Sequence, residues 1–378
     1  MTICSIPQLS YQAFGHQIRP KIFQYRIPYG GALELTYRCN LHCVHCYCNL
    51  PPHDRSAKTQ ELTYSEICQC LDEMADAGCL RLLITGGEPL LRPDFWEIYS
   101  YAKGRGFIIE LFTNGTLMTS TLIEQFAEYP PCDIEITIYG LSEKTHERIT
   151  RSKGSFRKTH SAIKHILAKK LSLTLKTVVM TLNKDEFLGI KRFAETLGVR
   201  FRFDPFINPR LDGSPEPSQW RLSPQEVIDF DFADKKRAQQ LEENFKELQG
   251  LQTDSLYLCS AGLTGFNVNP YGQVSPCTMT QSQGYNLRSI GFSQGWQEIM
   301  PKLINQRMDA DFPCRNCELV YLCEQCPGWA ELEKGNPQRV VDFLCQVTQL
   351  RQKNFGSKEV KRDGKEKTPM AKTTAKTG

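Results

Sequence analysis

The chain has 378 residues, a formal net charge of +4 and 16 cysteines. This length allows two domains, or one large domain with a smaller module. No run of about eighteen apolar residues occurs and no signal-like segment opens the chain, which disfavours a membrane-spanning or secreted protein. Many cysteines without an export signal indicate a cytoplasmic protein whose clustered thiols bind metal rather than form disulfides.

Most of the positive charge lies at the C-terminal end. Residues 351–378 hold nine Lys/Arg and three Asp/Glu, so residues 1–350 carry a small net negative charge. This segment is poor in large apolar residues, which predicts a disordered basic tail. Contact with an acidic partner or nucleic acid is the alternative role for the tail. Because residues 1–350 show no basic face with interleaved aromatics, nucleic-acid binding is disfavoured.

The predicted elements follow an N-terminal extension at residues 1–30. Apolar runs that predict strands alternate with amphipathic segments that predict helices. The predicted strands are 33–37, 80–85, 107–113, 133–139, 173–181 and 199–206, and the predicted helices are 63–77, 92–103, 117–128, 155–169 and 184–197. This alternation predicts an α/β fold with a parallel sheet. Six βα units are too few to close an eight-unit barrel, so we expect an open, partial barrel over residues 31–207.

The second half of the chain differs in composition. Residues 208–253 begin with a segment rich in Pro, Gly and Ser, which predicts a linker. A capping box from Ser223 to Glu226 then predicts a helix that runs, with a break, to about Leu248. Residues 254–350 form a separate, cysteine-dense module.

Three cysteines follow the first predicted strand, Cys39, Cys43 and Cys46, spaced Cys-x3-Cys-x2-Cys. Three thiolates can hold three corners of a cubane iron–sulfur cluster and leave the fourth iron open to a small molecule. The alternatives are a zinc site, with a nearby histidine or Cys48 as the fourth ligand, and a group of buried cysteines.

Further motifs fall at the ends of the next strands. Gly86, Gly87, Glu88 and Pro89 directly follow the second strand. Two glycines let the backbone approach a ligand, and the carboxylate could accept hydrogen bonds from an ammonium group, although a tight turn also explains the motif. Similar polar motifs end the third and fourth strands. Because ligands bind at the carboxyl ends of parallel strands, we expect all these motifs to share one site.

Together these motifs resemble those of the radical S-adenosylmethionine (SAM) enzymes. In that family the open iron chelates SAM, and reductive cleavage releases a 5′-deoxyadenosyl radical. The resemblance implies that Cys39, Cys43 and Cys46 hold this 4Fe–4S cluster. It also implies SAM contacts at Tyr47, Gly86, Gly87, Glu88, Pro89, Thr113, Asn114, Thr137 and Arg151.

One departure from the family concerns an arginine that pairs with the SAM carboxylate. Many relatives carry His-Asp-x-Ile-Arg, whereas this chain has His146-Glu-Arg-Ile-Thr150 followed by Arg151. The guanidinium therefore comes from Arg148 or Arg151, or the contact is absent. For Tyr47, packing within the loop is an equal alternative to a place beside adenine.

The C-terminal module contains a second group of seven cysteines: Cys259, Cys277, Cys314, Cys317, Cys323, Cys326 and Cys345. Its two Cys-x2-Cys pairs could form a Cys4 zinc site, which leaves the other three cysteines unexplained. The spacing resembles the SPASM domain, which binds two auxiliary 4Fe–4S clusters. That resemblance implies a distal set (Cys314, Cys317, Cys323, Cys345) and a proximal set (Cys259, Cys277, Cys326).

Two departures affect the second cysteine group. The last spacing is x2 rather than x3, and no cysteine follows shortly after Cys259. The proximal cluster thus has an open iron, a non-cysteine ligand or lower occupancy. The remaining cysteines are expected to be small buried hydrophobes, with Cys48 the least certain: Cys4, Cys48, Cys68, Cys70, Cys79 and Cys132.

The two-domain resemblance implies an enzyme that acts on peptides. We expect hydrogen abstraction from a residue of a ribosomally synthesised precursor peptide, giving a crosslink, an oxidation or a backbone rearrangement. The implied partners are that peptide, a separate small leader-recognition protein and an electron donor such as flavodoxin or ferredoxin, with no membrane. The alternatives are a small-molecule, haem or quinone-cofactor pathway enzyme and a non-catalytic electron carrier. Asp204 and Asp212 lie near the sheet end, but neither is singled out as a base.

Overall fold

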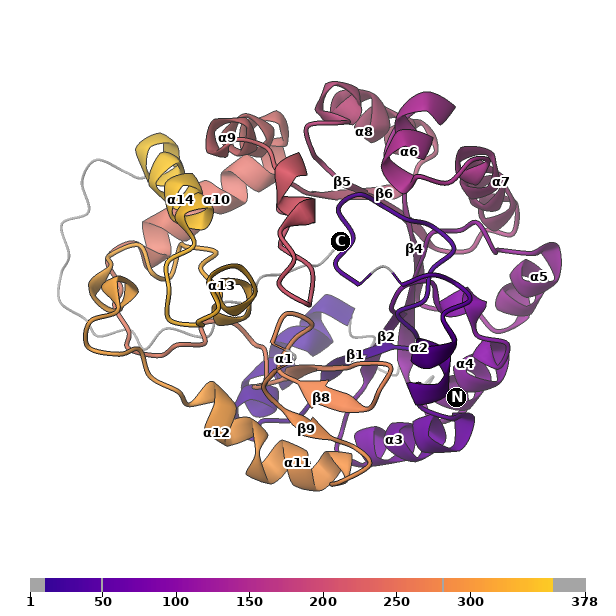
Figure 1. The fold of residues 1–378 in the computed structure, drawn as a ribbon, viewed down its shortest axis with the longest axis horizontal. Helices are drawn as coiled ribbons and strands as arrows, with labels where there is room; N and C mark the ends of the chain where they lie inside the picture. Colours follow the sequence, from indigo (N-terminus) through magenta and orange to yellow (C-terminus); the bar gives the residue numbers. More distant parts are fainter. Residues whose placement is uncertain (1–10, 49, 281, 356–378) are drawn as a thin grey trace, which may run out of the picture.

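A curved sheet with an outer ring of helices forms the centre of the molecule (Figure 1). The computed structural model describes residues 11–48, 50–280 and 282–355. Six parallel strands lie in the order β6-β5-β4-β3-β2-β1. They are β1 (Gly30–Glu34), β2 (Arg81–Thr85), β3 (Ile108–Thr113), β4 (Asp133–Thr137), β5 (Leu173–Val178) and β6 (Arg200–Asp204). The predicted α/β class and open, partial barrel are confirmed.

Helices cover one face of this sheet because the strands alternate apolar and polar residues. In β3, for example, Ile109 and Leu111 are fully buried, while the residues between them face the other side. The apolar side chains pack against α3 (Tyr64–Asp76), α4 (Phe95–Gly104), α5 (Ser120–Glu128), α7 (Ser155–Ala168) and α8 (Phe187–Thr196). The opposite, inner face is polar and is free to surround a ligand.

Some elements differ from the predictions. The first strand ends at Glu34 rather than 37. Leu35 N still donates to Thr85 O, but Thr36 O then accepts from Gly87 N, which is out of register with the β1–β2 ladder. Three helices that precede β6 in the described chain were not predicted: α1 (Tyr11–Gln24), α2 (Arg55–Gln60) and α6 (Glu143–Thr150). Four short 3-10 turns complete the connections: η1 (Pro89–Leu91), η2 (Lys184–Glu186), η3 (Glu216–Trp220) and η4 (Pro313–Asn316).

The predicted cysteine-rich module begins by extending the sheet. Its strands are β7 (Gly265–Val268), β8 (Gln273–Ser275) and β9 (Tyr285–Asn286). Strand β7 pairs in parallel with β1, and β8 and β9 follow in antiparallel order. The rest of the module consists of loops with α11 (Phe292–Glu298), α12 (Met300–Ile304) and α13 (Pro327–Lys334). The module therefore shares a sheet with the barrel instead of standing apart from it.

Three helices connect the module to the barrel at the left of Figure 1: α9 (Pro224–Ala233), α10 (Lys235–Leu248) and α14 (Asp342–Phe355). The predicted start of the tail at residue 351 is wrong. Arg351 is 1% exposed, and its Nε lies 2.8 Å from Oδ2 of the buried Asp231. The helix therefore continues to Phe355, and residues 356–378 lie outside the described residues. Within the described chain, no helix has the length and apolar character needed to cross a membrane.

Candidate functional site

The loop after β1 brings Cys39, Cys43 and Cys46 together. The pKa of the Cys39 thiol is raised to about 12, first by burial and then by the charges of Glu88 and Cys46. Burial also raises the pKa of Cys43, and Cys46 and Cys39 add to this effect. The mutual repulsion means that the three sulfur atoms lie near one another. We call residues 39–46 the cluster loop.

A network of hydrogen bonds connects the cluster loop to the next two strand ends. The Glu88 carboxylate is fully buried and accepts hydrogen bonds from Thr113 Oγ1 (2.8 Å), Asn114 N (2.8 Å) and Leu90 N (3.1 Å). Asn114 Nδ2 in turn lies 3.8 Å from Cys39 Sγ. Glu88 and Thr113 thus hold the site together through their side chains, and any SAM contact from the Glu88 turn would come from its backbone.

The glycines of that turn dock directly on the segment that leads into Cys39. Gly87 N donates to Thr36 O (2.7 Å), and Glu88 N donates to Arg38 O (3.0 Å). A Cβ atom at Gly86 would lie 2.3 Å from Thr36 O, and one at Gly87 would lie 2.4 Å from Arg38 O. No side chain fits at either position, so both glycines are needed for this close approach.

Tyr47 reaches the inner face of the barrel. Its hydroxyl donates to Glu34 Oε1 (2.8 Å), while Glu34 Oε2 accepts from Tyr37 OH (3.1 Å) and Asn267 Nδ2 (2.9 Å). Burial raises the pKa of Glu34 despite these three donors. Asn267 lies on β7, so this cluster unites the barrel with the cysteine-rich module. Sequence analysis missed Glu34 and Asn267, since their separation of 233 residues leaves no local signal.

Charged side chains line the inner face farther along the sheet. Arg202 pairs with Glu135 and lies over the ring of Phe112, at 5.1 Å from its centre. Lys176 neighbours Arg202 in the β5–β6 register and also lies over Phe112, at 5.8 Å. Thr137 pairs with Lys176 at the end of β4. Polar residues at inward-facing strand positions were the sequence signal for this lining.

His45 connects the cluster loop to this charged lining. Its Nε2 lies 3.3 Å from Tyr139 OH, and Nδ1 is buried without a hydrogen-bond partner among the described residues. Burial lowers the pKa of His45 to about 3, with a further contribution from Lys176 and an opposing one from Asp204. The His45 ring is therefore neutral and lies between the cysteines and the interior of the barrel.

The predicted arginine contact remains a prediction. Arg151 is exposed, adopts a left-handed conformation (φ 49°) and caps the C-terminus of α6. Arg148 is also exposed on the same helix. Asp212 lies in the loop that leads into η3. Its Oδ1 accepts a hydrogen bond from Ser214 N (2.9 Å), which indicates that Asp212 stabilises a turn.

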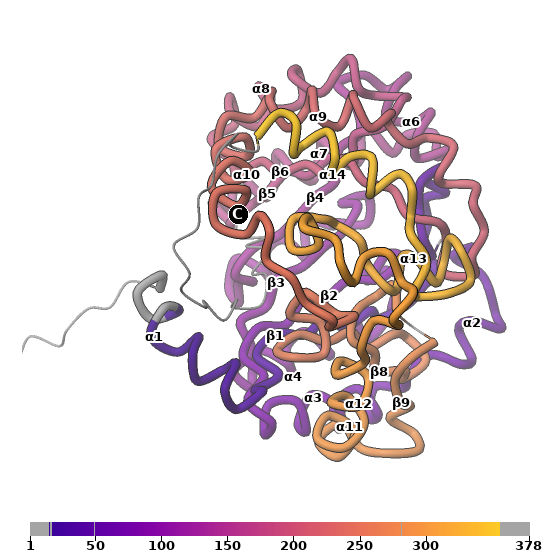
Figure 2. The backbone as a smooth tube through the Cα atoms, turned by 90° about the vertical axis from the view of Figure 1, so that its left-hand side faces the viewer, coloured from indigo at the N-terminus to yellow at the C-terminus, as the bar shows by residue number. Residues whose placement is uncertain are grey.

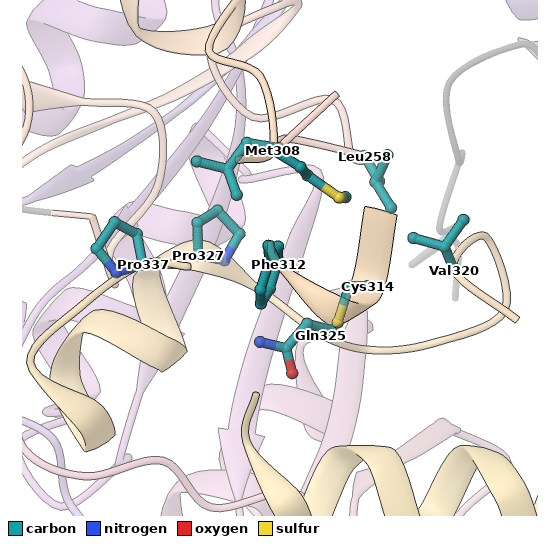
Figure 3. A pocket seen from close by; sticks show the side chains of 9 residues that line it. Leu258, Met308, Phe312, Cys314, Val320, Gln325, Pro327 and Pro337 are labelled. Atoms are coloured by element: carbon teal, nitrogen blue, oxygen red, sulfur yellow. The ribbon is translucent and has the colours of Figure 1, made fainter. Parts of the chain in front are cut away.

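The distal set of module cysteines comes together as a group. The pKa of Cys314 is raised to about 12, first by burial and then by repulsion from Cys323, Cys317 and Cys345. Cys314 also lines an apolar pocket with Leu256, Leu258, Met308, Phe312, Val320, Gln325, Pro327 and Pro337 (Figure 3). The distal set therefore lies next to an apolar part of the module.

The proximal set is likewise a group. Burial raises the pKa of Cys326 to about 12, and Cys277 and Cys259 add to the effect. Tyr257 lies among the same three sulfurs, since their charges raise its pKa beyond the effect of burial. Its hydroxyl donates to Gln283 Oε1 (2.9 Å).

The other cysteines differ in burial. Cys68 on α3 is only partly buried, short of the expected burial. Cys48, Cys70 and Cys79 are buried as expected, and Cys48 hydrogen-bonds with Cys46 beside the cluster loop. Cys132 is exposed, which contradicts the expected burial, because it lies in the surface turn before β4. Cys4 lies outside the described residues.

The three cysteine sets fit iron–sulfur clusters by their donor chemistry. Each consists of thiols, the ligands of such clusters, and a buried polar network holds the first set. Among the described residues, no three Cys, His, Asp or Glu side chains converge closely enough to hold a single metal ion. Within each set the thiols raise one another's pKa, while iron binding by the sets remains a prediction.

Comparison with known proteins identifies the family. The model of the radical SAM superfamily matches residues 33–194. The chain is 26% identical over 332 residues to the AdoMet-dependent heme synthase of Methanosarcina barkeri, covering 81% of this chain and 93% of that protein. It is 27% identical over 313 residues to the PqqA peptide cyclase of Bradyrhizobium diazoefficiens, covering 77% and 79%.

Solved structures show the same fold. Streptococcus suis SuiB bound to its precursor peptide SuiA superimposes with a TM-score of 0.69 at 16% identity, covering 92% of this chain and 84% of that one. This likeness includes the parallel six-stranded sheet and the cysteine-rich region that follows it. Residues 33–194 thus form a radical SAM domain, in an enzyme related to the SPASM-type peptide maturases.

Proposed function

We propose that this radical SAM enzyme modifies a ribosomally synthesised precursor peptide, in which it forms a crosslink, an oxidised residue or a rearranged backbone. The observation that carries the proposal is the similarity to PqqA peptide cyclase, which spans 77% of the chain and 79% of that protein. Two auxiliary clusters suit a net two-electron oxidation, because they can accept the electron that remains after hydrogen abstraction.

The family implies a 4Fe–4S cluster and SAM at the first site, and SPASM-type relatives imply auxiliary clusters. Cys39, Cys43 and Cys46 would hold the first cluster, and the distal and proximal sets would hold the others. When bound, the reduced cluster and SAM supply a carbon radical that removes a hydrogen atom from the substrate.

The chain's own residues would bind and orient the substrate. The inner face offers both charge signs, with Glu135 beside Arg202 and Lys176 one strand away. A peptide backbone or polar side chain can exchange hydrogen bonds with such a lining. Strand β7 extends the sheet next to β1, and Asn267 on β7 donates a hydrogen bond to the Glu34 carboxylate on the inner face.

A haem-pathway reaction is the second candidate. It is favoured by the heme synthase relative, of which the alignment covers 93%. The two functions differ in substrate class, so a direct comparison separates them.

In the test, the enzyme is loaded with iron–sulfur clusters, reduced and supplied with SAM. It is then given either a small peptide encoded beside the gene or a carboxylated tetrapyrrole. We expect mass spectrometry to show a peptide lighter by two hydrogen atoms for a crosslink or oxidation, or a changed fragment pattern for a rearrangement. An unchanged peptide together with a converted tetrapyrrole would overturn the proposal in favour of the second candidate.

A further inference from the structure

An exposed basic surface covers α6 and the start of α7. We call it the α6–α7 basic patch and define it by six exposed residues: Lys144, Arg148, Arg151, Lys153, Arg157 and Lys158. From residue 143 to 170 the sequence holds nine Lys/Arg and two Asp/Glu, although residues 1–350 as a whole are slightly negative. The positive charge is therefore concentrated on one surface.

Few acidic residues adjoin this surface, and they already form an ion pair or accept hydrogen bonds within the protein. Glu143 pairs with Arg157 (3.0 Å), which remains 74% exposed. Glu147 Oε1 accepts from Gly154 N (2.7 Å), and Glu186 accepts from Leu141 N (2.6 Å). These carboxylates serve local structure and leave most of the patch charge uncompensated.

The patch adjoins the cluster loop. His42 N donates to Thr150 O (2.9 Å), and Val44 N donates to Ile149 O (3.0 Å). Figure 2 shows the indigo N-terminal part of the chain running beside α6. His42 is itself exposed. Only the backbone of α6 and of the cluster loop would then lie between a protein docked on the patch and the three cysteines.

We propose that the α6–α7 basic patch is the docking surface for a small acidic electron-transfer protein. The proposal rests on iron binding at the cluster loop, as in the proposed function. The donor is oxidised by one electron and the iron centre is reduced by one, with no bond made or broken between the two proteins. A positive surface steers an acidic donor toward the loop and raises its association rate, an effect that salt screens.

The experiment compares two charge-reversed variants of the loaded enzyme. The patch variant carries Lys144→Glu, Lys153→Glu and Lys158→Glu, which leaves the candidate SAM contact untouched. The control carries Lys235→Glu, Lys236→Glu and Lys302→Glu on α10 and α12, with the same change in net charge. SAM cleavage is measured once with photoreduced flavodoxin at varied concentration and salt, and once with enzyme reduced beforehand by excess dithionite.

We expect the KM for flavodoxin to rise about tenfold or more in the patch variant at low salt, with a weaker salt dependence than in the control. Cleavage by dithionite-reduced enzyme should stay the same in both variants. An equal KM in the two variants would overturn the docking proposal, as would a parallel loss with both reductants. If the unmutated enzyme cleaved no SAM even after dithionite reduction, the assigned chemistry itself would fail, which is a distinguishable outcome.

Discussion

Arg38 and Glu61 form a buried ion pair with two hydrogen bonds, directly before the first cysteine of the cluster loop. Arg38 Nε lies 2.8 Å from Glu61 Oε1, and Nη2 lies 2.9 Å from Oε2. Arg92 approaches the same carboxylate at 3.9 Å. Glu61 also accepts from the Thr36 hydroxyl. One carboxylate from the segment after α2 therefore fixes the backbone on which both Cys39 and the Gly86–Gly87 turn depend.

Removing Glu61 should strongly destabilise the protein. In Glu61→Ala the buried Arg38 and Arg92 lose a carboxylate that neutralises their positive charge. We therefore expect the free energy of unfolding to fall by about 3–5 kcal/mol. Urea denaturation measures this change. As the control, Glu242→Ala breaks an exposed pair with Lys246 and should cost less than about 0.5 kcal/mol. Equal effects of the two substitutions would show that the buried pair does not hold the loop.

The close docking of Gly87 predicts a second effect. In Gly87→Ala the new methyl group meets the carbonyl oxygens of Arg38 and Tyr37 at 2.4 and 2.7 Å. We expect a loss of about 1–3 kcal/mol in stability and a marked loss of SAM cleavage. Gly104 has no atom within 4 Å of its Cβ position, so Gly104→Ala should leave both quantities unchanged or slightly raise stability. Normal cleavage by Gly87→Ala would contradict the assigned role of the turn.

The distal set predicts a selective change in iron content. The double substitution Cys314→Ala, Cys317→Ala leaves only two thiols in the distal set and should lower the iron content from about twelve to about eight per chain, because one cubane of three is lost. Cys132, an exposed cysteine outside the three sets, provides the control, and Cys132→Ser should keep the full iron content. Iron and sulfide analysis after anaerobic loading gives both values. Unchanged iron in the double variant would contradict a cluster at the distal set.

His146 predicts a loss of stability in mild acid. Burial, with help from His160, lowers its pKa to about 4. The unfolded chain therefore takes up a proton first, and stability falls as the pH drops from about 6.5 toward 4, by up to about 3 kcal/mol.

The variant His146→Phe keeps an aromatic ring beside Tyr139 and Phe156. Its unfolding midpoint in urea should change less between pH 7 and pH 4.5 than that of the unmutated protein. The same pH dependence in both proteins would mean that His146 is not the titrating group.

The sequence predicted those parts of the fold that depend on local pattern. The six strands β1–β6 carry apolar residues at alternate positions, so their existence and order were predictable. Helix α6 has a polar sequence that offers little apolar periodicity, although Ser142 caps it. Strands β7–β9 have two to four residues each, and β7 pairs with β1, from which it is distant in the sequence. No local pattern predicts this pairing.

The candidate site, like the fold, was predictable from the sequence only where it depends on local motifs. The spacing of the cysteines predicted three sets whose thiols raise one another's pKa in the structure, and their role as cluster ligands stays a prediction. A polar side chain at Thr113 or Asn114 was expected to face SAM, whereas Thr113 Oγ1 and Asn114 N both donate to the Glu88 carboxylate. The inner-face cluster of Glu34, Tyr47 and Asn267 joins distant segments, so only the tertiary structure reveals it.

The most direct test measures iron, sulfide and 5′-deoxyadenosine in one sample of protein loaded anaerobically and treated with SAM and a strong reductant. We predict about twelve irons per chain, as expected for three cubanes, together with release of 5′-deoxyadenosine. About eight irons with cleavage would mean that the proximal set, one cysteine short, does not hold a full cluster. Bound zinc without any SAM cleavage would contradict the account.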